Sequence, residues 1–566
     1  MAVDARVRPD ASSIAGFVAL GIVVALATAL VLDSTSGLWF FNDEWNYILF
    51  RLPITPSSYL DDVNGQLVAG GVGLLQLLYR VFGLTSYEPY RIFLVCVQAV
   101  FGVVSFVYLR RRIGNLGALV AVTLLLFLGA AWEDLLWPVQ FLFYVPLVMT
   151  LAALMLVERK TRAGDAGCAA CLVVGLTTSF FGIPAACAVA VELAVQRAYR
   201  RLWIALVPLG LYAVWMIAFS TGGGASSDNV SRVPEYTLRI AGIAVGALTG
   251  LDGWRGPFPY HVDAGRVAAL VLLGLVTGTI VYLARRRHEL PPRLAAVIVM
   301  PLAFWTANAI TRAQFDAWSA SRYVLPSAFY VILVVAELLT WLRPSRRVAL
   351  VLTAAAVVLA VHVVPWNLDR LDAGRAWLAG RADSLRARLG ALEVLRPDIR
   401  DPSLPLDVGS PYITTPRAYY GAVDRLGSST QELRRAVVRQ PEDANAVAVA
   451  ALEARLAPAT AGHTGRPHVA GSRSVTIEPA GDCIKVVPKS RRGSVALRGD
   501  AVDVDLEPDP GAEANISVDL FGGGRAPVEL GSIRAPSTLT LPAVEERMAW
   551  TVVIALRGGL RICGST

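Results

Sequence analysis

The stretch that decides the fold is Ile14–Leu32, IAGFVALGIVVALATALVL, which is soon followed by the acidic motif Phe41–Trp45, FNDEW. An uncharged apolar run of this length can cross a bilayer as a helix. Because Arg6 and Arg8 precede it, the positive-inside rule places the N-terminus in the cytoplasm and the acidic motif outside. The run lacks a convincing small-residue cleavage site, so we interpret it as an uncleaved first span.

The composition indicates a polytopic membrane protein. The chain has 566 residues, of which 55% are hydrophobic and 17% charged, and this is too apolar for a soluble protein of such length. Most of the net charge of +8 comes from residues 1–364, where basic clusters separate apolar segments and orient spans, so no nucleic-acid partner is expected. The clusters are Arg110–Arg112, Arg159-Lys160, Arg200-Arg201, Arg285–Arg287 and Arg346-Arg347.

Apolar windows, read against their flanking charges, predict about eleven transmembrane helices in residues 1–365. Leu67–Val81 is interpreted as an amphipathic helix in the outer interface, because a crossing there would place Arg110–Arg112 outside. Tyr236–Leu251 is interpreted as a second interfacial or re-entrant segment. The expected spans are 12–32, 90–109, 114–131, 139–157, a pair within 166–196 broken at Phe181–Pro184, 202–220, 264–284, 294–310, 323–342 and 348–364.

The odd number of spans places the C-terminal region outside, where we expect two further domains. Residues 366–460 contain stretches in which charges alternate with Leu and Ala at helical spacing. After a linker at Ala457–His468, residues 468–566 carry short apolar runs separated by Gly, Pro and Asp, which predicts an antiparallel β-sandwich. Examples of such runs are Ser474–Ile477, Ile484–Val487, Ala501–Leu506, Ile516–Leu520 and Trp550–Leu556.

Two cysteines, Cys483 and Cys563, lie in this C-terminal region. An extracytoplasmic location would permit a disulfide between them. The β-domain is expected either to bind glycan or to act as a structural lid, and the sequence leaves both roles open.

The acidic motif carries the first candidate site. Two adjacent carboxylates at a membrane boundary, Asp43 and Glu44, are costly unless they are solvated, paired or used. Aromatic residues around them suit sugar faces and lipid headgroups, and Asp61 and Asp62 follow in the same outer loop. The structural alternative is that the pair solvates a loop or caps a helix.

A second acidic pair, Glu133-Asp134, is expected at the same membrane level between Trp132 and Trp137. Arginines on the predicted outer side run against the usual charge bias and therefore need a reason. The guanidinium of Arg322, in Ser321–Pro326, can hold a phosphate bidentately. The alternative is snorkelling to the interface.

The order of these features resembles the GT-C superfamily of membrane glycosyltransferases. An Asp-Glu pair follows the first span, an interfacial helix comes next, Phe82–Arg91 leads into the second span, and Ser321–Pro326 lies near the end of the bundle. The resemblance covers roughly residues 10–365. Members with an extracytoplasmic C-terminal β-domain look most similar, such as the arabinosyl- and mannosyltransferases that build cell-wall glycans.

This resemblance implies a polyprenyl-phosphate sugar donor, a glycan or glycolipid acceptor, and inverting transfer at the outer face of the plasma membrane. Asp43 would be the general base, and Glu44 would position the acceptor or share that role. Arg322 would hold the donor phosphate, with Arg91 and Arg312 as weaker candidates. The residues expected to contact the sugar are Glu133, Asp134, Gln140 and Tyr144 by hydrogen bonding, Trp132 and Trp137 by stacking, and Asp61 and Asp62 in the first loop.

Some members of the superfamily bind a divalent cation at such acids. No ligand set for a cation is evident in this sequence, so a metal stays possible without assigned ligands.

Two other functions are compatible with the sequence. One is a transporter or flippase of lipid-linked glycans, and the other is a non-catalytic scaffold that binds glycan. Transporters need ionisable groups near the bilayer midplane, whereas the acids of this chain gather at one surface, apart from Glu192 and Glu337 near cytoplasmic ends. This pattern favours surface chemistry.

Overall fold

The computed structural model describes residues 11–221, 226–251, 263–287, 291–316, 320–459, 462–544 and 548–566. The chain divides into two compact units, which are described one at a time below. Unit 1 consists of Met1–Gly37, Phe50–Val81 and Tyr87–Leu378. Unit 2 consists of Leu38–Leu49, Phe82–Ser86 and Ala379–Thr566.

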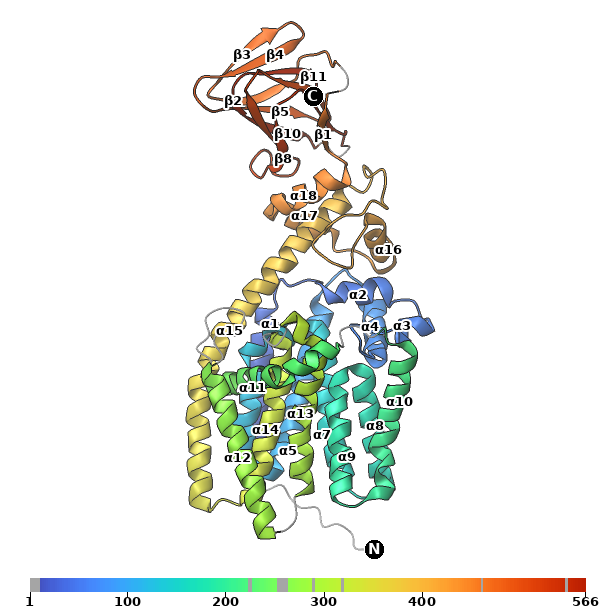
Figure 1. Cartoon of the computed structure of the whole chain (residues 1–566), viewed down its shortest axis with the longest axis vertical. Coiled ribbons are helices and arrows are strands. Elements are labelled where there is room, and N and C mark those ends of the chain that lie inside the picture. Colours follow the sequence, from blue (N-terminus) through green and yellow to red (C-terminus); the bar gives the residue numbers. More distant parts are fainter. Residues whose placement is uncertain are drawn as a thin grey trace. The chain divides into compact units, whose positions relative to one another are not determined.

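Unit 1 is built from apolar helices (Figure 1). In the described part of the chain, seven helical segments are long and apolar enough to cross a membrane, and shorter apolar helices accompany them. The chain is therefore a multi-pass membrane protein, as the sequence predicts. The helices are α1 (Ala11–Ser34), α3 (Pro56–Leu60), α4 (Ala69–Phe82), α5 (Glu88–Leu126), α6 (Trp132–Leu136), α7 (Phe141–Val157), α8 (Arg162–Thr178), α9 (Ile183–Val195), α10 (Trp203–Phe219), α11 (Val233–Thr249), α12 (Asp263–Arg287), α13 (Pro292–Arg312), α14 (Val324–Leu342) and α15 (Arg346–Val394).

The second and third predicted spans form one helical run, α5, which folds back on itself. Gly114 is its non-helical residue, with φ +74°. A Cβ atom placed on Gly102 would lie 3.1 Å from Leu126 Cδ1, so the two halves pack side by side. Glycine suits the turn because it adopts positive φ without steric cost.

The stretch 166–196 is broken where the sequence predicts. The helix α8 ends at Thr178, a short 3-10 turn spans Phe180–Gly182, and α9 begins at Ile183. Pro184 occupies the first turn of α9, where its missing N–H costs no hydrogen bond. Neither helix is long enough to be counted among the seven long apolar segments.

Two segments interpreted as interfacial are helices of their own. Leu67–Val81 corresponds to α4, and Tyr236–Leu251 corresponds to α11. Figure 1 shows α11 lying across the direction of α12 and α14. Buried residues along α11, including Ile240 and Ala244, pack it against these neighbours.

The last predicted span does not end at residue 364. Instead, α15 continues as one helix from Arg346 to Val394 and carries Pro365 inside it. At 1.5 Å per residue such a helix is much longer than a bilayer is thick. The first charged stretch of residues 366–460 is therefore the continuation of the last span, because helix-forming Ala, Leu and Arg residues follow the apolar part without a break.

Unit 2 combines short helices with a two-sheet β-sandwich, as predicted for the C-terminal region. The strand orders are β1-β9-β6-β11-β4-β3 and β2-β5-β10-β7-β8. Its helices are α2 (Asp43–Phe50), α16 (Pro416–Leu426), α17 (Thr430–Arg439) and α18 (Pro441–Ala451). Its strands are β1 (Arg455–Pro458), β2 (Val469–Arg473), β3 (Val475–Ala480), β4 (Cys483–Pro488), β5 (Gly493–Gly499), β6 (Val502–Pro508), β7 (Glu513–Asp519), β8 (Val528–Ile533), β9 (Ser537–Leu541), β10 (Trp550–Arg557) and β11 (Leu560–Ser565).

The sandwich core follows the two-residue period of the strands. Val502, Val504 and Leu506 of β6 are buried. On β10, which pairs with β5 and β7, Trp550 and Ile554 are buried in the same way. Each of the five quoted apolar runs overlaps a strand, whereas strands rich in Gly, Ser and Thr, such as β2, β5 and β9, are not among the quoted runs.

Two links, one covalent and one polar, are attached to interior strands of the six-stranded sheet. Cys483 of β4 and Cys563 of β11 form a disulfide with Cα atoms 4.5 Å apart. In the predicted linker, His463 lies with Nε2 3.1 Å from Asp503 and Nδ1 3.0 Å from Asp505. The hydrogen bond to Asp505 and the charge of Asp503 raise the pKa of His463 above its ordinary value. The linker is therefore tied to β6.

Candidate active site

The acidic motif forms the start of α2, in unit 2. Asn42 adopts φ +43°, and the chain then enters the helix at Asp43. Glu44 is buried, and its Oε2 accepts a hydrogen bond of 2.9 Å from the backbone N–H of Phe41. Two carboxylates in the first turn are stabilised by the positive end of the helix dipole. Glu44 thus caps the entry to the helix.

Asp43 is placed differently from Glu44. Its side chain is half-buried, and Oδ1 accepts a hydrogen bond of 2.9 Å from the hydroxyl of Tyr412. Tyr412 comes from the loop before α16, far away in sequence but in the same unit. The carboxylate is therefore held in one orientation while remaining partly accessible.

The aromatic residues around the motif are packed in a core. Trp45 is fully buried, with ring centroids 5.9 Å from Trp39 and 5.8 Å from Tyr419. Tyr419 in turn donates a 2.8 Å hydrogen bond to Glu393. These rings fix the backbone of the motif against residues 379–426, and the buried Trp faces are not open to a sugar in this structure.

The second acidic pair belongs to unit 1, where Glu133 binds the segment that carries Arg322. Oε2 of Glu133 accepts hydrogen bonds from the Ser321 hydroxyl at 2.7 Å and from the Arg322 backbone N–H at 3.0 Å. Oε1 lies 3.3 Å from Nη2 of Arg322. The structure thus brings together two residues that were predicted separately. Arg322 keeps 31% of its side chain exposed, so its guanidinium remains reachable.

Asp134 is fully buried beside this pair. Within the described residues, neither of its carboxyl oxygens has a hydrogen-bond partner. Burial raises the pKa of Asp134 well above its ordinary value and the charge of Glu133 adds to the rise, while the charge of Arg322 opposes it. The neutral form of Asp134 is therefore favoured.

The other predicted sugar contacts around this loop are also buried. They are Trp132, Trp137, Gln140 and Tyr144. Trp132 packs on Trp377, with ring centroids 5.3 Å apart, and a Cβ on Gly374 would lie 2.2 Å from its indole ring. This close approach of α15 shows why a glycine stands at 374. In this structure Trp132 therefore packs the helix, and its face is not offered to a ligand.

The two weaker phosphate candidates, Arg91 and Arg312, are engaged by the protein. Arg91 is buried, forms an ion pair with Glu88, donates a 2.8 Å hydrogen bond to Thr35, and donates another to the Leu32 carbonyl at the end of α1. Arg312 donates a hydrogen bond of 2.9 Å to the carbonyl of Asn64. Both arginines thus hold loops at the ends of helices.

The remaining acids of the first loop also make local contacts. Asp61 lies 3.8 Å from Arg51. Asp62 accepts hydrogen bonds from the N–H and hydroxyl of Thr221, at 3.0 and 2.8 Å, and from the N–H of Gly65 at 2.7 Å. Burial acts to raise the pKa of Asp62, but these hydrogen bonds lower it overall. Among the residues described, no group of three or more His, Cys, Asp or Glu side chains is arranged to hold a metal ion.

Two polar partners were not among the residues predicted from the sequence. Ser321 stands next to Arg322 in the quoted motif, so its involvement could have been suspected. Tyr412 has no such signal, because the 369 residues that separate it from Asp43 carry no pattern that pairs them.

No protein-family model and no curated protein matches the chain. Among solved structures it is similar to ArnT from Cupriavidus metallidurans, at TM-score 0.43 and 14% identity over 75% of this chain and 91% of ArnT. It is also similar to arabinosyltransferase EmbB from Mycobacterium smegmatis, at TM-score 0.32 and 12% identity over 96% of this chain and 64% of EmbB. At these TM-scores the similarity assigns no residue roles, so the chemistry is argued from the side chains of this chain.

Proposed function

We propose that the chain is an inverting GT-C type glycosyltransferase. It would move a sugar from a polyprenyl-phosphate donor to a cell-envelope glycan or lipid acceptor at the outer face of the membrane. The N-terminus would be cytoplasmic, and the helical region 366–460 and the carbohydrate-binding-like β-sandwich 468–566 would lie outside. The observation that carries the proposal is the half-buried carboxylate of Asp43, which Tyr412 orients at a helix N-terminus. The same chain contains a multi-pass apolar bundle.

Asp43 is proposed as the general base. An acceptor hydroxyl gives its proton to the carboxylate as its oxygen attacks the anomeric carbon. The acceptor oxygen attacks from the face opposite the phosphate as the bond between that carbon and the phosphate oxygen breaks, so the configuration inverts and the phosphate leaves with the bonding electrons. Support for this role comes from the contrast within the pair, because Glu44 is buried and caps the helix while Asp43 stays accessible.

Arg322 is proposed to hold the donor phosphate. A phosphate leaves without protonation when a cation stabilises its charge, and a guanidinium suits this task because it binds phosphate oxygens bidentately. The contacts of Glu133 to the Ser321 hydroxyl, to the Arg322 N–H and to the Arg322 side chain support a positioning role for Glu133.

The transporter alternative receives less support from the charged residues inside the bundle. Glu192 pairs with Arg293 at 2.9 Å, and Glu337 pairs with Arg112. Carboxylates that are already paired with arginines are poor candidates for a site that must bind and release a coupling ion.

The experiment uses the purified full-length protein in nanodiscs with a panel of radiolabelled polyprenyl-phosphate sugars and a glycan acceptor. Wild type is compared with Asp43→Asn, and Glu44→Gln serves as the matched control at the neighbouring carboxylate. We expect transfer by wild type, loss of transfer in Asp43→Asn with donor binding retained, and a smaller loss in Glu44→Gln. If wild type and both variants bind the donor but transfer no sugar, the proposal is wrong and a transporter or scaffold is favoured.

A further inference from the structure

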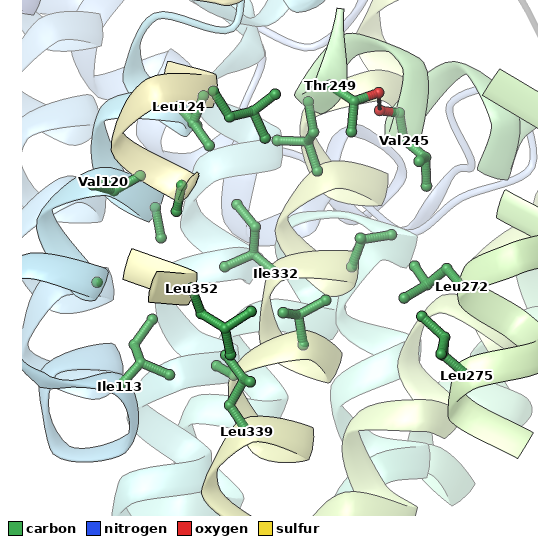
Figure 2. Close-up of a pocket in the computed structure, with 18 of the residues that line it drawn as sticks. Ile113, Val120, Leu124, Val245, Thr249, Leu272, Leu275, Ile332, Leu339 and Leu352 are labelled. Carbon is green, nitrogen blue, oxygen red and sulfur yellow. Dashed lines mark hydrogen bonds between the residues drawn. The ribbon is translucent and has the colours of Figure 1, made fainter. Parts of the chain in front are cut away.

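A large apolar cavity lies within unit 1, among α5, α11, α12, α14 and α15. Its volume is about 1180 Å³. Figure 2 shows side chains from these helices, among them Ile113, Val245 and Leu272, turned toward one space. Three threonines line it, but Thr249, Thr340 and Thr353 each donate a hydrogen bond to a carbonyl of their own helix. The lining of the cavity is therefore apolar and suits an apolar ligand.

The cavity opens toward the outside of the bundle. Val271 of α12 and Leu352 of α15 both line it, yet they are 57% and 44% exposed. In a membrane this side faces lipid, so acyl chains have direct access.

The depth of the cavity matches one leaflet. Along α14 the lining runs from Val331 to Arg343, which corresponds to roughly 18 Å of helix. Half of a typical hydrocarbon core is about 15 Å thick. A lipid whose chains fill one leaflet therefore fits the cavity along the bundle.

One end of the cavity is basic. Arg343 and Pro344 line it there, and Arg346 and Arg347 follow before the lining residue Ala349. Within the described residues these three arginines are exposed and make no ion pair. Arg112 also lines this end, but its charge is compensated by Glu337 and Glu158. The surplus charge at the rim is thus positive.

We propose that this cavity is a binding site for an anionic phospholipid of the leaflet at the basic end. The acyl chains occupy the apolar space, and the phosphate lies against Arg343, Arg346 and Arg347. Basic pockets between transmembrane helices hold acidic headgroups in this way. The positive-inside rule assigns this end to the cytoplasmic leaflet, away from the outer face at which the proposed transfer takes place. The inference does not depend on the transferase proposal.

The test measures lipid binding to the purified full-length protein by native mass spectrometry, with phosphatidylglycerol and phosphatidylcholine as probes. We expect phosphatidylglycerol to bind in preference, with about fivefold weaker binding for each arginine removed in Arg343→Gln, Arg346→Gln and Arg347→Gln. The matched control removes three exposed cations from another turn, in Arg159→Gln, Lys160→Gln and Arg162→Gln, and leaves binding unchanged.

A second pair of variants tests the cavity itself. Ala356→Phe fills it and lowers phosphatidylglycerol binding at least tenfold, whereas Ala354→Phe on the same helix, which does not line the cavity, leaves binding unchanged. Equal binding of both lipids, or no response to the arginine and cavity variants, would overturn the proposal. Displacement of phosphatidylglycerol by a polyprenyl phosphate at one equivalent would also overturn it, because the cavity would then belong to the donor chain.

Discussion

The two acidic pairs of this protein are alike in sequence, but their carboxylates differ in burial and in hydrogen-bond partners. In Asp43-Glu44 one carboxylate caps a helix and the other stays half-buried, held by a tyrosine hydroxyl. In Glu133-Asp134 one carboxylate binds the Ser321-Arg322 segment and the other is fully buried without a hydrogen-bond partner among the described residues. Neighbouring acids thus have separate tasks, and burial decides which of them can meet a substrate.

Under the proposed mechanism, one pair would take part in proton transfer and the other would position a cation. A general base must be reachable by the acceptor, and of the four acids Asp43 best combines access with a fixed orientation. Glu133 fits the task of orienting Arg322, since its two oxygens are already occupied by that segment. Variants at the four positions should therefore give four different results.

The largest effect is expected for Asp43→Asn. Removal of a general base should lower kcat by about 10²- to 10⁴-fold, with little change in donor binding. Initial rates of sugar transfer in nanodiscs measure the first quantity, and equilibrium binding of radiolabelled donor measures the second. If Asp43→Asn retains the wild-type kcat, Asp43 is not the general base, and the proposed difference in role between the two acidic pairs is wrong.

A smaller effect is expected for Glu133→Gln. The amide keeps an acceptor for Ser321 but loses the charge that pairs with Arg322, and charge-assisted hydrogen bonds contribute about 1.5–3 kcal/mol. We expect the donor KM to rise roughly tenfold while kcat changes less. Arg322→Lys keeps the charge but not the bidentate geometry and should give a similar rise. If kcat fell as steeply as in Asp43→Asn, the positioning role would be wrong.

The hydroxyl of Tyr412 should have a milder influence. Tyr412→Phe removes the donor to Asp43 and leaves the ring, so we expect kcat to fall about three- to tenfold, because one partly exposed hydrogen bond contributes about 0.5–1.5 kcal/mol. Tyr420→Phe, in the same helical region, is a control that leaves kcat unchanged. Equal rates for Tyr412→Phe and wild type would mean that the tyrosine does not orient the carboxylate during turnover.

The smallest effect on turnover is expected for Asp134→Asn, whose signature is a pH dependence of stability. In the unfolded chain an aspartate ionises near pH 4, whereas burial keeps Asp134 protonated in the fold to higher pH. The unfolded state then binds fewer protons, so the stability of the wild type falls as pH rises above about 4.

Asp134→Asn should not lose stability in this way as pH rises, because an amide does not titrate. Thermal unfolding midpoints of the purified protein, taken for both chains from pH 4 to 8, should therefore diverge in favour of Asp134→Asn as pH rises. Parallel curves would show that Asp134 is ionised in the fold and would require a partner for it.

The apolar bundle could be predicted because spanning length and flanking charge act locally. The break before Ile183 was found from the sequence Phe181–Pro184, which contains a glycine and a proline, and five strands of the sandwich were found from short apolar runs. The continuation of α15 was missed, because a span was assumed to end where its apolar residues end. Strands such as β9, Ser537–Leu541, were missed because their pairing partners, and not their own composition, make them strands.

The candidate site was predictable only in part, and for a related reason. The acidic pairs and Arg322 stood out because charge near a membrane boundary is unusual. The sequence could not say that Glu133 and Arg322 meet, or that the aromatic residues near Asp43 are packed inside, since both depend on contacts between distant segments. Tyr412 was out of reach for the same reason.

The fold-back of α5 at Gly114 has a consequence for depth in the bilayer. Its two halves are joined through a single non-helical residue, Gly114, and no longer loop between them would let one half move independently of the other. Neither half can shift along the membrane normal without carrying the other with it. The cluster Arg110–Arg112 lies directly before the turn and resists entering the hydrocarbon. The cluster Arg110–Arg112 therefore sets the depth in the membrane of both halves of α5, including the half that leads to Glu133.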